Sequence, residues 1–273
     1  MRPIRTSRRA AACCAAAIVF CAVPCSAKSY SVPSPSNQTI SEAMTKAGMG
    51  DTVWVDNGVY REHVLVAPGV ALKARSLFGA VLDGGGRGTV VTLAKSNALS
   101  GFEVRNGTIG VFSNGPGNVI KACRIIRNWQ TGIITVRHLP RIEDNVIAFN
   151  RASGIQGWDV RSTSYSVNHN TIAFNGNHGV AMGGSSNILL ENNVIAFNER
   201  FALKILPESE AVRVANNNLY KNLRAPGGVP RGNFSFDPAF ISPRGAMNFA
   251  SDPQHCCQTK GTDNKNLGVR LDY

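Results

Sequence analysis

Short runs of alternating hydrophobic and polar residues fill most of this chain, and they recur at a nearly fixed interval. The segment Asn145-Val-Ile-Ala-Phe-Asn150 is copied almost letter for letter at 170–175 and 193–198, and in an altered form at 217–222. Alternation over a few residues predicts strands with one buried face. A repeat in the low twenties of residues predicts that one structural unit stacks on itself as a solenoid.

Asparagines mark this repeat in two columns. The first column recurs at intervals of 22, 22, 25, 23 and 24 residues, and the second lies five residues ahead of its last four members. Because Asn tolerates a left-handed backbone conformation, we expect each to mark a tight corner. Stacked amides can also hydrogen-bond along the axis. We therefore predict two structural ladders, Asn106, Asn128, Asn150, Asn175, Asn198 and Asn222, and Asn145, Asn170, Asn193 and Asn217.

The same alternation divides the chain into segments. The capping-box pattern Thr39-Ile-Ser-Glu42 predicts a short helix that covers the open end of the solenoid. We expect a lead-in and cap helix at 28–50, a parallel β-helix at 51–223, and an irregular carboxy-terminal cap and tail at 224–273. The polar tail from Ser251 is expected to be loosely attached. Ile147, Ile172, Ile195 and Leu219 should stack inside the coil.

The column of Phe149, Phe174 and Phe197 leaves two interpretations open. The rings either pack in the core or under a cap, or they form an outer aromatic stripe that binds sugar. Arg105, Arg127 and Lys221 occupy the same column in the flanking rungs, so the pattern does not decide between them.

The first 27 residues are typical of a secretory signal peptide. A basic stretch is followed by an apolar run from Ala10 to Val23 that is too short to span a bilayer comfortably, and then by the small residues Ser26 and Ala27. We expect an exported protein, periplasmic or extracellular, that does not span the membrane. Four of the seven cysteines lie in this segment. Of the others, Cys123 holds a ladder position and should be an inert buried thiol, while the pairing of Cys256 and Cys257 stays open.

Net charge narrows the classes of partner. The formal charge is +12, and +8 without the four arginines of the signal segment. A basic exported protein suits an acidic polysaccharide or an anionic cell surface, although plain solubility explains the charge equally well. Nucleic acid is disfavoured because aromatic and basic residues do not interleave in a stacking platform. The sequence predicts a monomer.

Several segments together resemble the pectin-lyase-like superfamily. Gly50-Asp-Thr-Val-Trp-Val55 and Gly58-Val-Tyr60 resemble its entry segment, the Asn-x-Ile-Ala-Phe-Asn copies look like its β-helix repeats, and Phe236-Asp-Pro-Ala-Phe240 is similar to the closing segment of many bacterial secreted members. The resemblance implies an all-β, single-domain, right-handed parallel β-helix with three strands per rung and about eight rungs. That hand agrees with the general preference of parallel crossovers. The resemblance is weak evidence for function because the superfamily holds lyases, hydrolases, esterases, epimerases, adhesins and periplasmic accessory proteins.

The resemblance also directs the search for chemistry. The paired acidic signatures of its hydrolases are absent, and Asn177-His178-Gly179 only approaches their Gly-His-Gly motif. Uronate lyases and C5-epimerases need less: a cation for the sugar carboxylate, a base and an acid. Their site usually lies on the outer face of the strands that open with Gly-Ile or Gly-Val here. By alternation that face carries Phe112, Ile134, Gln156, Ala181 and Lys204.

We therefore predict one lateral patch. His138, Lys204 and Arg161 are the candidate catalytic residues, and Trp158, Asp159, Arg137 and Gln156 are the candidate substrate-binding residues. Equivalent positions of successive rungs stack along one side of a solenoid, so these residues should share a face. No metal site and no certain cofactor is predicted, with Ca²⁺ as a candidate cation.

Two functions from different classes stay open. The first is a carbohydrate-active or carbohydrate-binding protein, in its enzymatic form a polysaccharide lyase or C5-epimerase acting on acidic polysaccharide. The alternative is a non-catalytic solenoid that binds glycan or a cell surface. Whether the chain is an enzyme is undecided at this point, because the missing signatures count against catalysis and the cationic, aromatic turns count for a ligand.

Overall fold

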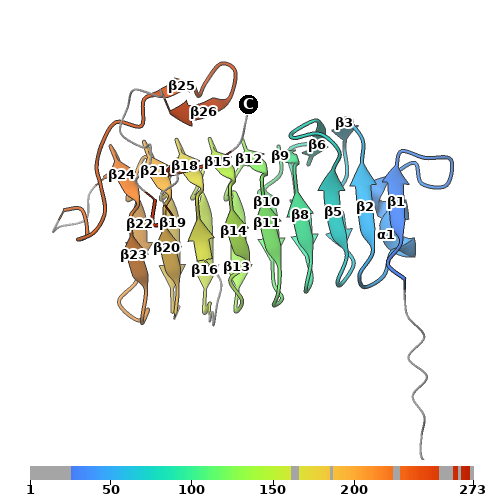
Figure 1. Cartoon of the computed structure of the whole chain (residues 1–273), viewed down its shortest axis with the longest axis horizontal. Helices are drawn as coiled ribbons and strands as arrows, with labels where there is room; N and C mark the ends of the chain where they lie inside the picture. Colours follow the sequence, from blue (N-terminus) through green and yellow to red (C-terminus); the bar gives the residue numbers. More distant parts are fainter. Residues whose placement is uncertain are drawn as a thin grey trace, which may run out of the picture.

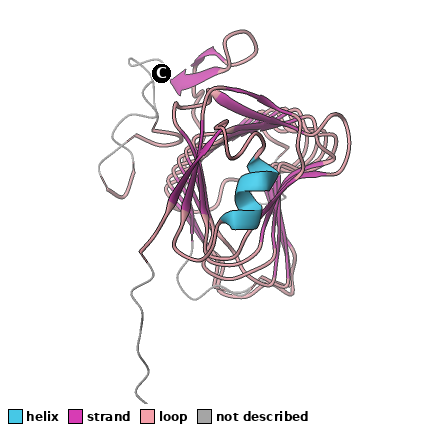
Figure 2. Ribbon diagram, turned by 90° about the vertical axis from the view of Figure 1, so that its right-hand side faces the viewer, coloured by secondary structure: helices cyan, strands magenta, loops and turns pink. Residues whose placement is uncertain are grey.

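Three parallel sheets wind around one axis and build most of the molecule. The computed structural model describes residues 26–160, 166–184, 187–223, 228–251, 261–263 and 266–270. Strands stack side by side along the long axis of the molecule (Figure 1), and the end-on view shows the strands on three sides of the coil (Figure 2). The fold is a right-handed parallel β-helix of about eight turns. The fold class predicted from the sequence is confirmed.

Each complete rung contributes one strand to each sheet, and the end rungs contribute to only some of them. The first sheet has nine strands: β1 Ser29–Val32, β2 Thr52–Val55, β5 Ala71–Ala74, β8 Ala98–Ser100, β11 Val119–Lys121, β14 Arg141–Glu143, β17 Ser166–Asn168, β20 Leu189–Glu191 and β23 Arg213–Ala215. The second has seven: β4 Val64–Val66, β7 Thr89–Leu93, β10 Ile109–Ser113, β13 Ile133–Val136, β16 Ile155–Trp158, β19 Val180–Gly183 and β22 Leu203–Ile205. The third has eight: β3 Gly58–Tyr60, β6 Ala80–Asp83, β9 Glu103–Arg105, β12 Arg124–Ile126, β15 Val146–Ala148, β18 Thr171–Ala173, β21 Val194–Ala196 and β24 Asn218–Tyr220.

The interior is a continuous stack of aliphatic side chains. Ile147, Ile172, Ile195 and Leu219 pair in register on β15, β18, β21 and β24 and are buried. Alternate residues of a strand point to opposite faces, so one inward residue per short strand suffices to build the core. The predicted aliphatic stack is confirmed. β1 lies in the lead-in, where no strand was predicted, and pairs with β2.

The helix α1 (Ile40–Lys46) closes the amino-terminal end of the coil (Figure 2). Thr39 Oγ1 accepts a hydrogen bond from the Glu42 backbone N–H at 3.1 Å, and the Glu42 carboxylate accepts from the Thr39 N–H at 3.3 Å. This reciprocal capping box is the one that the sequence predicted. Ile40, Ala43 and Met44 are buried against the first rungs, so the helix shields apolar side chains that the first rung would expose.

The residue that turns each left-handed corner and the ladder asparagine are neighbours in the chain, not the same residue. The left-handed residue stands directly before each ladder asparagine, as Phe149, Phe174 and His169 do with φ of 57°, 56° and 53°. The prediction that the ladder asparagines themselves adopt this conformation is wrong. Their side chains instead point inward and hydrogen-bond from rung to rung, as in the bond from Asn150 Nδ2 to Asn175 Oδ1 at 3.0 Å.

The ladders differ from the predicted columns at their ends. Asn106 is not a ladder member, because Asn128 Oδ1 accepts from the Gly107 N–H at 3.0 Å, while Asn106 has φ of 55° and donates to Asp83. The sequence aligns Asn106 with the column, but the backbone register places it one residue early, at the left-handed corner. At the other end Asn233 continues the second ladder, accepting from Asn217 Nδ2 at 2.9 Å.

A carboxy-terminal hairpin covers the outer face of the third sheet. Its strands β25 (Phe240–Ser242) and β26 (Asn248–Ser251) are antiparallel and lie beside β24, β21 and β18 (Figure 1). Outward side chains of this sheet, such as Val146 and Ala148, are buried with Phe249. Phe149, Phe174 and Phe197 stack with centroids 5.2 and 4.9 Å apart and pack against Phe240 and Phe249, so the phenylalanine column is covered by the cap.

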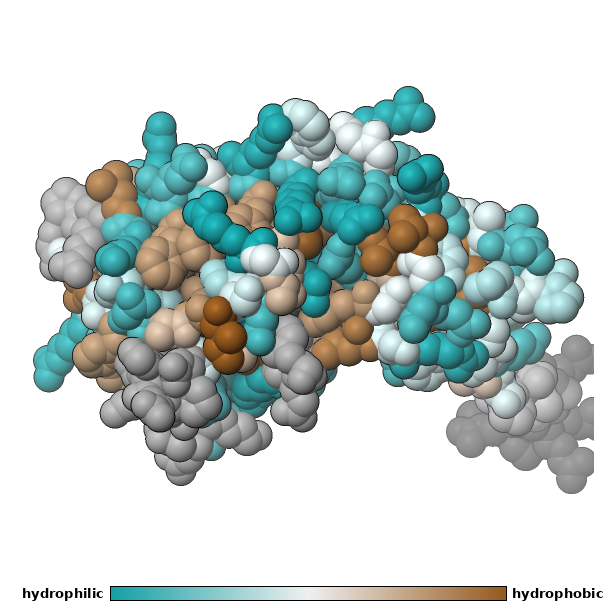
Figure 3. Space-filling view, turned by 90° about the horizontal axis from the view of Figure 1, so that it is seen from above, coloured by the Kyte–Doolittle hydropathy of each residue, from teal (hydrophilic) through white to brown (hydrophobic). Residues whose placement is uncertain are grey.

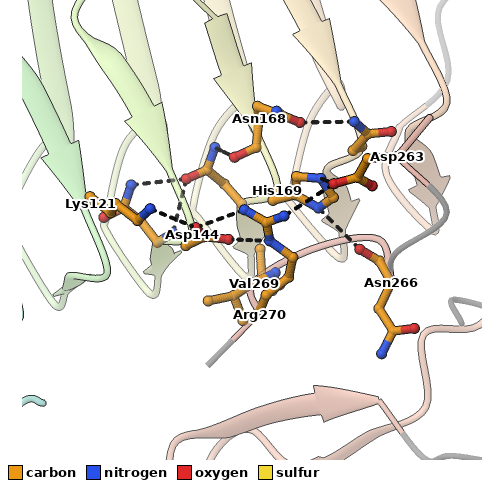
Figure 4. A network of polar contacts seen from close by, with 12 residues as sticks. Lys121, Asp144, Asn168, His169, Asp263, Asn266, Val269 and Arg270 are labelled. Atoms are coloured by element: carbon orange, nitrogen blue, oxygen red, sulfur yellow. Dashed lines mark hydrogen bonds and ion pairs between the residues drawn. The ribbon is translucent and has the colours of Figure 1, made fainter. Parts of the chain in front are cut away.

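The described part of the tail is attached by a polar network (Figure 4). Arg270 donates to both Asp144 oxygens at 2.6 and 2.9 Å. The His169 ring lies between the Asn266 carbonyl, 3.1 Å from Nδ1, and the Asp263 carboxylate, 3.2 Å from Nε2. The expectation of a loosely attached tail is therefore wrong for residues 261–263 and 266–270. Their polar groups hydrogen-bond to Asp144 and His169, which stand at left-handed corners of successive rungs.

No helix among the described residues is long and apolar enough to cross a membrane.

Candidate functional site

A hollow lies on the outer face of the second sheet, across β16, β19 and β22. We call it the lateral hollow; its volume is about 230 Å³. The strands and the turns that precede them supply its lining, which consists of Ser153, Gln156, Gly157, Trp158, Asn177, His178, Ala181, Met182, Gly183, Lys204 and Leu206.

Strand register fixes the middle of the hollow. Gln156 pairs with Ala181, and Ala181 pairs with Lys204. Because neighbouring strands lie about 4.8 Å apart, Gln156 and Lys204 stand about 10 Å apart on either side of a small side chain. Ala181 thus forms a low floor between two polar groups.

Trp158 forms one wall. Its side chain is at the end of β16 and 46% exposed. The indole lies over Gly183, where an added Cβ would come within 3.4 Å of the ring and within 2.9 Å of Leu206. The absence of a side chain at Gly183 therefore lets the ring lie flat along the sheet with its other side open to solvent.

His178 lies opposite, and its hydrogen bonding fixes its tautomer. Its Nδ1 accepts from the Phe201 backbone N–H at 3.3 Å. A neutral imidazole has one donor nitrogen, so the proton sits on Nε2 and Nε2–H is a donor. Burial, and then the positive charges of Arg200 and Lys204, lower the pKa of His178 below its usual value. The ring therefore stays neutral at neutral pH.

Asn177 brings an unsatisfied acceptor to the same hollow. Its Oδ1 is buried and has no hydrogen-bond partner among the described residues. A buried polar atom without a partner costs about 1–3 kcal/mol. A ligand hydroxyl would remove this cost.

The charge of the hollow is positive. Lys204 is exposed, with its Nζ 5.6 Å from the centroid of the Phe201 ring. No aspartate or glutamate is among the lining residues in the described part of the chain. Its electrostatics favour an anionic ligand.

The structure brings together only part of the predicted patch. Trp158, Gln156 and Lys204 line the lateral hollow. Arg137, His138 and Asp159 do not: the first two belong to the turn after β13, one rung away, and Asp159 turns the left-handed corner beyond Trp158 with φ of 49°. Arg161 lies outside the described residues.

Among the lining residues that the sequence analysis did not place in the patch, Asn177 and His178 carry hydrogen-bonding groups that the binding argument uses. Asn177 and His178 precede β19 in the turn from the third sheet to the second, whereas the prediction considered only the strands and the turns after them. The signal was present, because Asn177-His178-Gly179 stands directly before one of the strands that open with glycine.

The family of the chain follows from its sequence. Residues 49–228 match the profile of NosD, described as a periplasmic copper-binding protein. The chain belongs to the NosD family. Among curated protein sequences, none is significantly similar to it.

The chain is also similar to solved structures of three polysaccharide-modifying enzymes. An alginate lyase from Paenibacillus sp. str. FPU-7 is 13% identical, with a TM-score of 0.45 over 71% of this chain and 77% of the other. A mutant of the periplasmic alginate epimerase AlgG is 15% identical, with a TM-score of 0.47 over 76% of this chain and 53% of its own, about half its length. Pectate lyase Pel9A is 11% identical, with a TM-score of 0.43 over 88% and 95%. None of these similarities assigns a role to a residue of this NosD-family chain.

Proposed function

We propose that this NosD-family protein is an exported solenoid that binds an acidic polysaccharide in the lateral hollow. The observation that carries the proposal is the combination on one face: the open ring of Trp158, the cation Lys204, and the unpartnered acceptor of Asn177. An acidic sugar unit offers a matching set, with an apolar ring face, a carboxylate and hydroxyl groups.

Each side chain has a defined part in binding. Trp158 packs against the apolar face of a sugar ring. Lys204 attracts the carboxylate, and the Nε2–H of His178 donates a hydrogen bond to it or to a neighbouring oxygen. Asn177 Oδ1 accepts from a sugar hydroxyl. Ala181 leaves the floor low enough for the ring to lie on the sheet.

The geometry favours binding over catalysis. A lyase or C5-epimerase needs a base that removes the proton at C5. The free lone pair of neutral His178 is on Nδ1, and it already accepts from the Phe201 backbone at 3.3 Å. No carboxylate among the described residues lines the hollow to serve in its place. His138, the base predicted from the sequence, belongs to the preceding rung.

The family name implies copper, but the described residues do not fit a copper centre. They contain no group of three or more His, Cys, Asp or Glu side chains able to hold a metal ion. Copper prefers imidazole, thiolate and thioether ligands. Burial raises the pKa of Cys123 to about 12, so this thiol stays protonated and inert. Both ring nitrogens of His169 already have partners. No step of the proposed function passes through copper.

Export belongs to the proposal. The family is named as periplasmic, and the basic and apolar pattern at 1–27 is typical of a signal peptide. Polysaccharides of the cell envelope and of the surroundings are the ligands within reach of such a protein.

The experiment is a titration of the mature protein with trigalacturonate, followed by calorimetry, in wild type and in Lys204→Ala and Trp158→Ala. Each substitution should weaken binding by roughly tenfold, since each removes about 1–2 kcal/mol of interaction. Arg213→Ala, on the first sheet, is the matched control for charge. Equal affinity of all four proteins would refute the proposal.

Catalysis is tested in the same samples. Pectate and alginate are incubated with the protein, with and without Ca²⁺, and ultraviolet absorbance is followed for unsaturated products. A rise in absorbance that is lost in Lys204→Ala would replace the binding function with a lyase.

A further inference from the structure

A second groove lies under the carboxy-terminal hairpin, and no part of the proposed function uses it. We call it the hairpin groove; its volume is about 520 Å³. One side is the ring stack of Phe149 and Phe174, and the other is the hairpin turn that carries Arg244. Arg151 and Glu199 also line it. The face that bears the hairpin mixes hydrophilic with hydrophobic residues (Figure 3).

Two arginines line the groove, and each is held against an aromatic ring. The Arg151 guanidinium lies 3.7 Å from the centroid of the Trp129 ring, and that of Arg244 lies 5.2 Å from the centroid of Phe174. A stacked guanidinium keeps its in-plane N–H donors free for a carboxylate or sulfate. Its reduced freedom also lowers the entropy lost when a ligand binds.

The charges of these arginines are not neutralised within the described part of the chain. The ion pairs there involve other arginines, such as Arg105 with Asp83 and Arg270 with Asp144. Neither Arg151 nor Arg244 forms one with a described residue. Glu199 leaves the groove with an excess of positive charge, and its carboxylate can accept hydrogen bonds from ligand hydroxyls.

The floor is kept open by Gly176. A Cβ at this position would meet the carbonyl oxygen of Arg151 at 2.5 Å. The repeat places Arg151 and Glu199 at the equivalent positions of the rungs before and after it. No side chain fits at 176 against the backbone of the Arg151 rung, so the floor stays low there.

Both binding surfaces share the same turns. Arg151 lines the groove, and Ser153, two residues later, lines the lateral hollow. In the next rung Gly176 lines the groove and Asn177 lines the lateral hollow. The two surfaces therefore lie on the two sides of one column of turns.

We infer that the hairpin groove is a second site for an anionic sugar unit, in which Arg151 and Arg244 bind its carboxylate or sulfate. The sugar chemistry rests on the proposed function, whereas the anion preference rests on the two arginines alone. One acidic chain that crosses the shared turns contacts both sites. Longer chains should then bind more tightly than short ones because the second contact is intramolecular.

The test begins by removing the first site. Trigalacturonate is titrated calorimetrically into Trp158→Ala/Lys204→Ala and into the same protein with Arg244→Gln added. The double variant should retain binding, and Arg244→Gln should weaken it by about tenfold, as expected for loss of a charge-assisted hydrogen bond. Arg213→Gln in the same background should leave the affinity unchanged. Unaltered melting of all variants, followed by circular dichroism, excludes loss of the fold.

Four further readouts decide the interpretation. Maltotriose should not bind, and a sulfated trisaccharide separates sulfate from carboxylate recognition. Fluorescence of Trp129 should change on binding, because its ring contacts Arg151. In wild type, hexagalacturonate should bind more tightly than trigalacturonate, and Arg244→Gln should remove this advantage.

Equal affinity with and without Arg244, or equal binding of maltotriose, overturns the second site. If Trp158→Ala/Lys204→Ala equals wild type but Arg244→Gln abolishes binding, the lateral hollow fails and the groove stands.

Discussion

Asn145 Nδ2 donates a hydrogen bond to Asn170 Oδ1 at 2.9 Å, and the same oxygen accepts from the Asn145 backbone N–H at 3.0 Å. Asn170 in turn donates to Asn193 Oδ1 at 3.1 Å and to the Ile142 carbonyl at 2.8 Å. One buried amide therefore satisfies groups on the rungs before and after it, and binds successive turns of the coil together.

Replacing Asn170 by Leu should destabilise the protein by at least about 3 kcal/mol, because several buried donors and acceptors lose their partner at once. Urea unfolding followed by circular dichroism measures the change. The exposed Asn114, replaced by Leu, is the control and should change stability by less than about 0.5 kcal/mol. Similar stabilities of the two variants would contradict the structural role of the ladder.

Filling the floor of the lateral hollow should block it without altering charge. Ala181→Trp places a large ring between Gln156 and Lys204, and binding of trigalacturonate to the lateral hollow should become roughly tenfold weaker. Ile134→Trp is the matched control, because Ile134 shares the column through its pairing with Gln156 but is not among the residues that line the hollow. Loss of binding in both variants, or in neither, would show that the ligand binds elsewhere.

The affinity for an anionic ligand should rise as the pH falls below 6.5. Burial, Arg200 and Lys204 lower the pKa of His178 from its usual 6.5, and a bound anion raises it again, so binding takes up a proton. Protonation adds a positive charge to the hollow, worth roughly fivefold in affinity at a partly exposed site. Calorimetry at several pH values measures the effect.

The same shift affects stability in the opposite sense. The pKa of His178 is lower in the fold than in the unfolded chain, so the unfolded chain binds the proton first, and stability falls as the pH drops below 6.5. His178→Asn should flatten the pH dependence of the affinity, and its side-chain oxygen can still accept from Phe201. It should only reduce the pH dependence of stability, because burial also lowers the pKa of His169.

Phe249→Ala should release the hairpin and leave the solenoid folded. Phe249 is 2% exposed and packs 6.0 Å from Phe149 and 5.4 Å from Phe240 between ring centroids. Removing a buried aromatic ring costs about 3–5 kcal/mol, and here the cost falls on docking of the hairpin. Amide hydrogen exchange should become faster at 240–251 and stay unchanged at 142–148. The exposed Ile241→Ala on the same hairpin should leave both segments protected.

The sequence by itself determined the repeat and therefore the coil. Recurrence of Asn-x-Ile-Ala-Phe-Asn fixed the rungs, the inward Ile147 and its equivalents, and the outward column of Gln156, Ala181 and Lys204. These follow from local periodicity, because alternate residues of a strand must point to opposite faces. The capping box of α1 was readable for the same reason, since it involves residues three apart.

Tertiary structure alone decided the features that depend on register or on distant segments. The left-handed corner falls one residue before each ladder asparagine, which spacing cannot reveal because both positions recur with the same period. Packing of Phe249 on Phe149, and of Arg270 on Asp144, joins segments 100 and 126 residues apart. The lateral hollow required His178 to come from the turn before the strand, where the backbone N–H of Phe201 fixes its ring. A contact of this kind depends on how neighbouring rungs fold together, and one rung's sequence does not encode it.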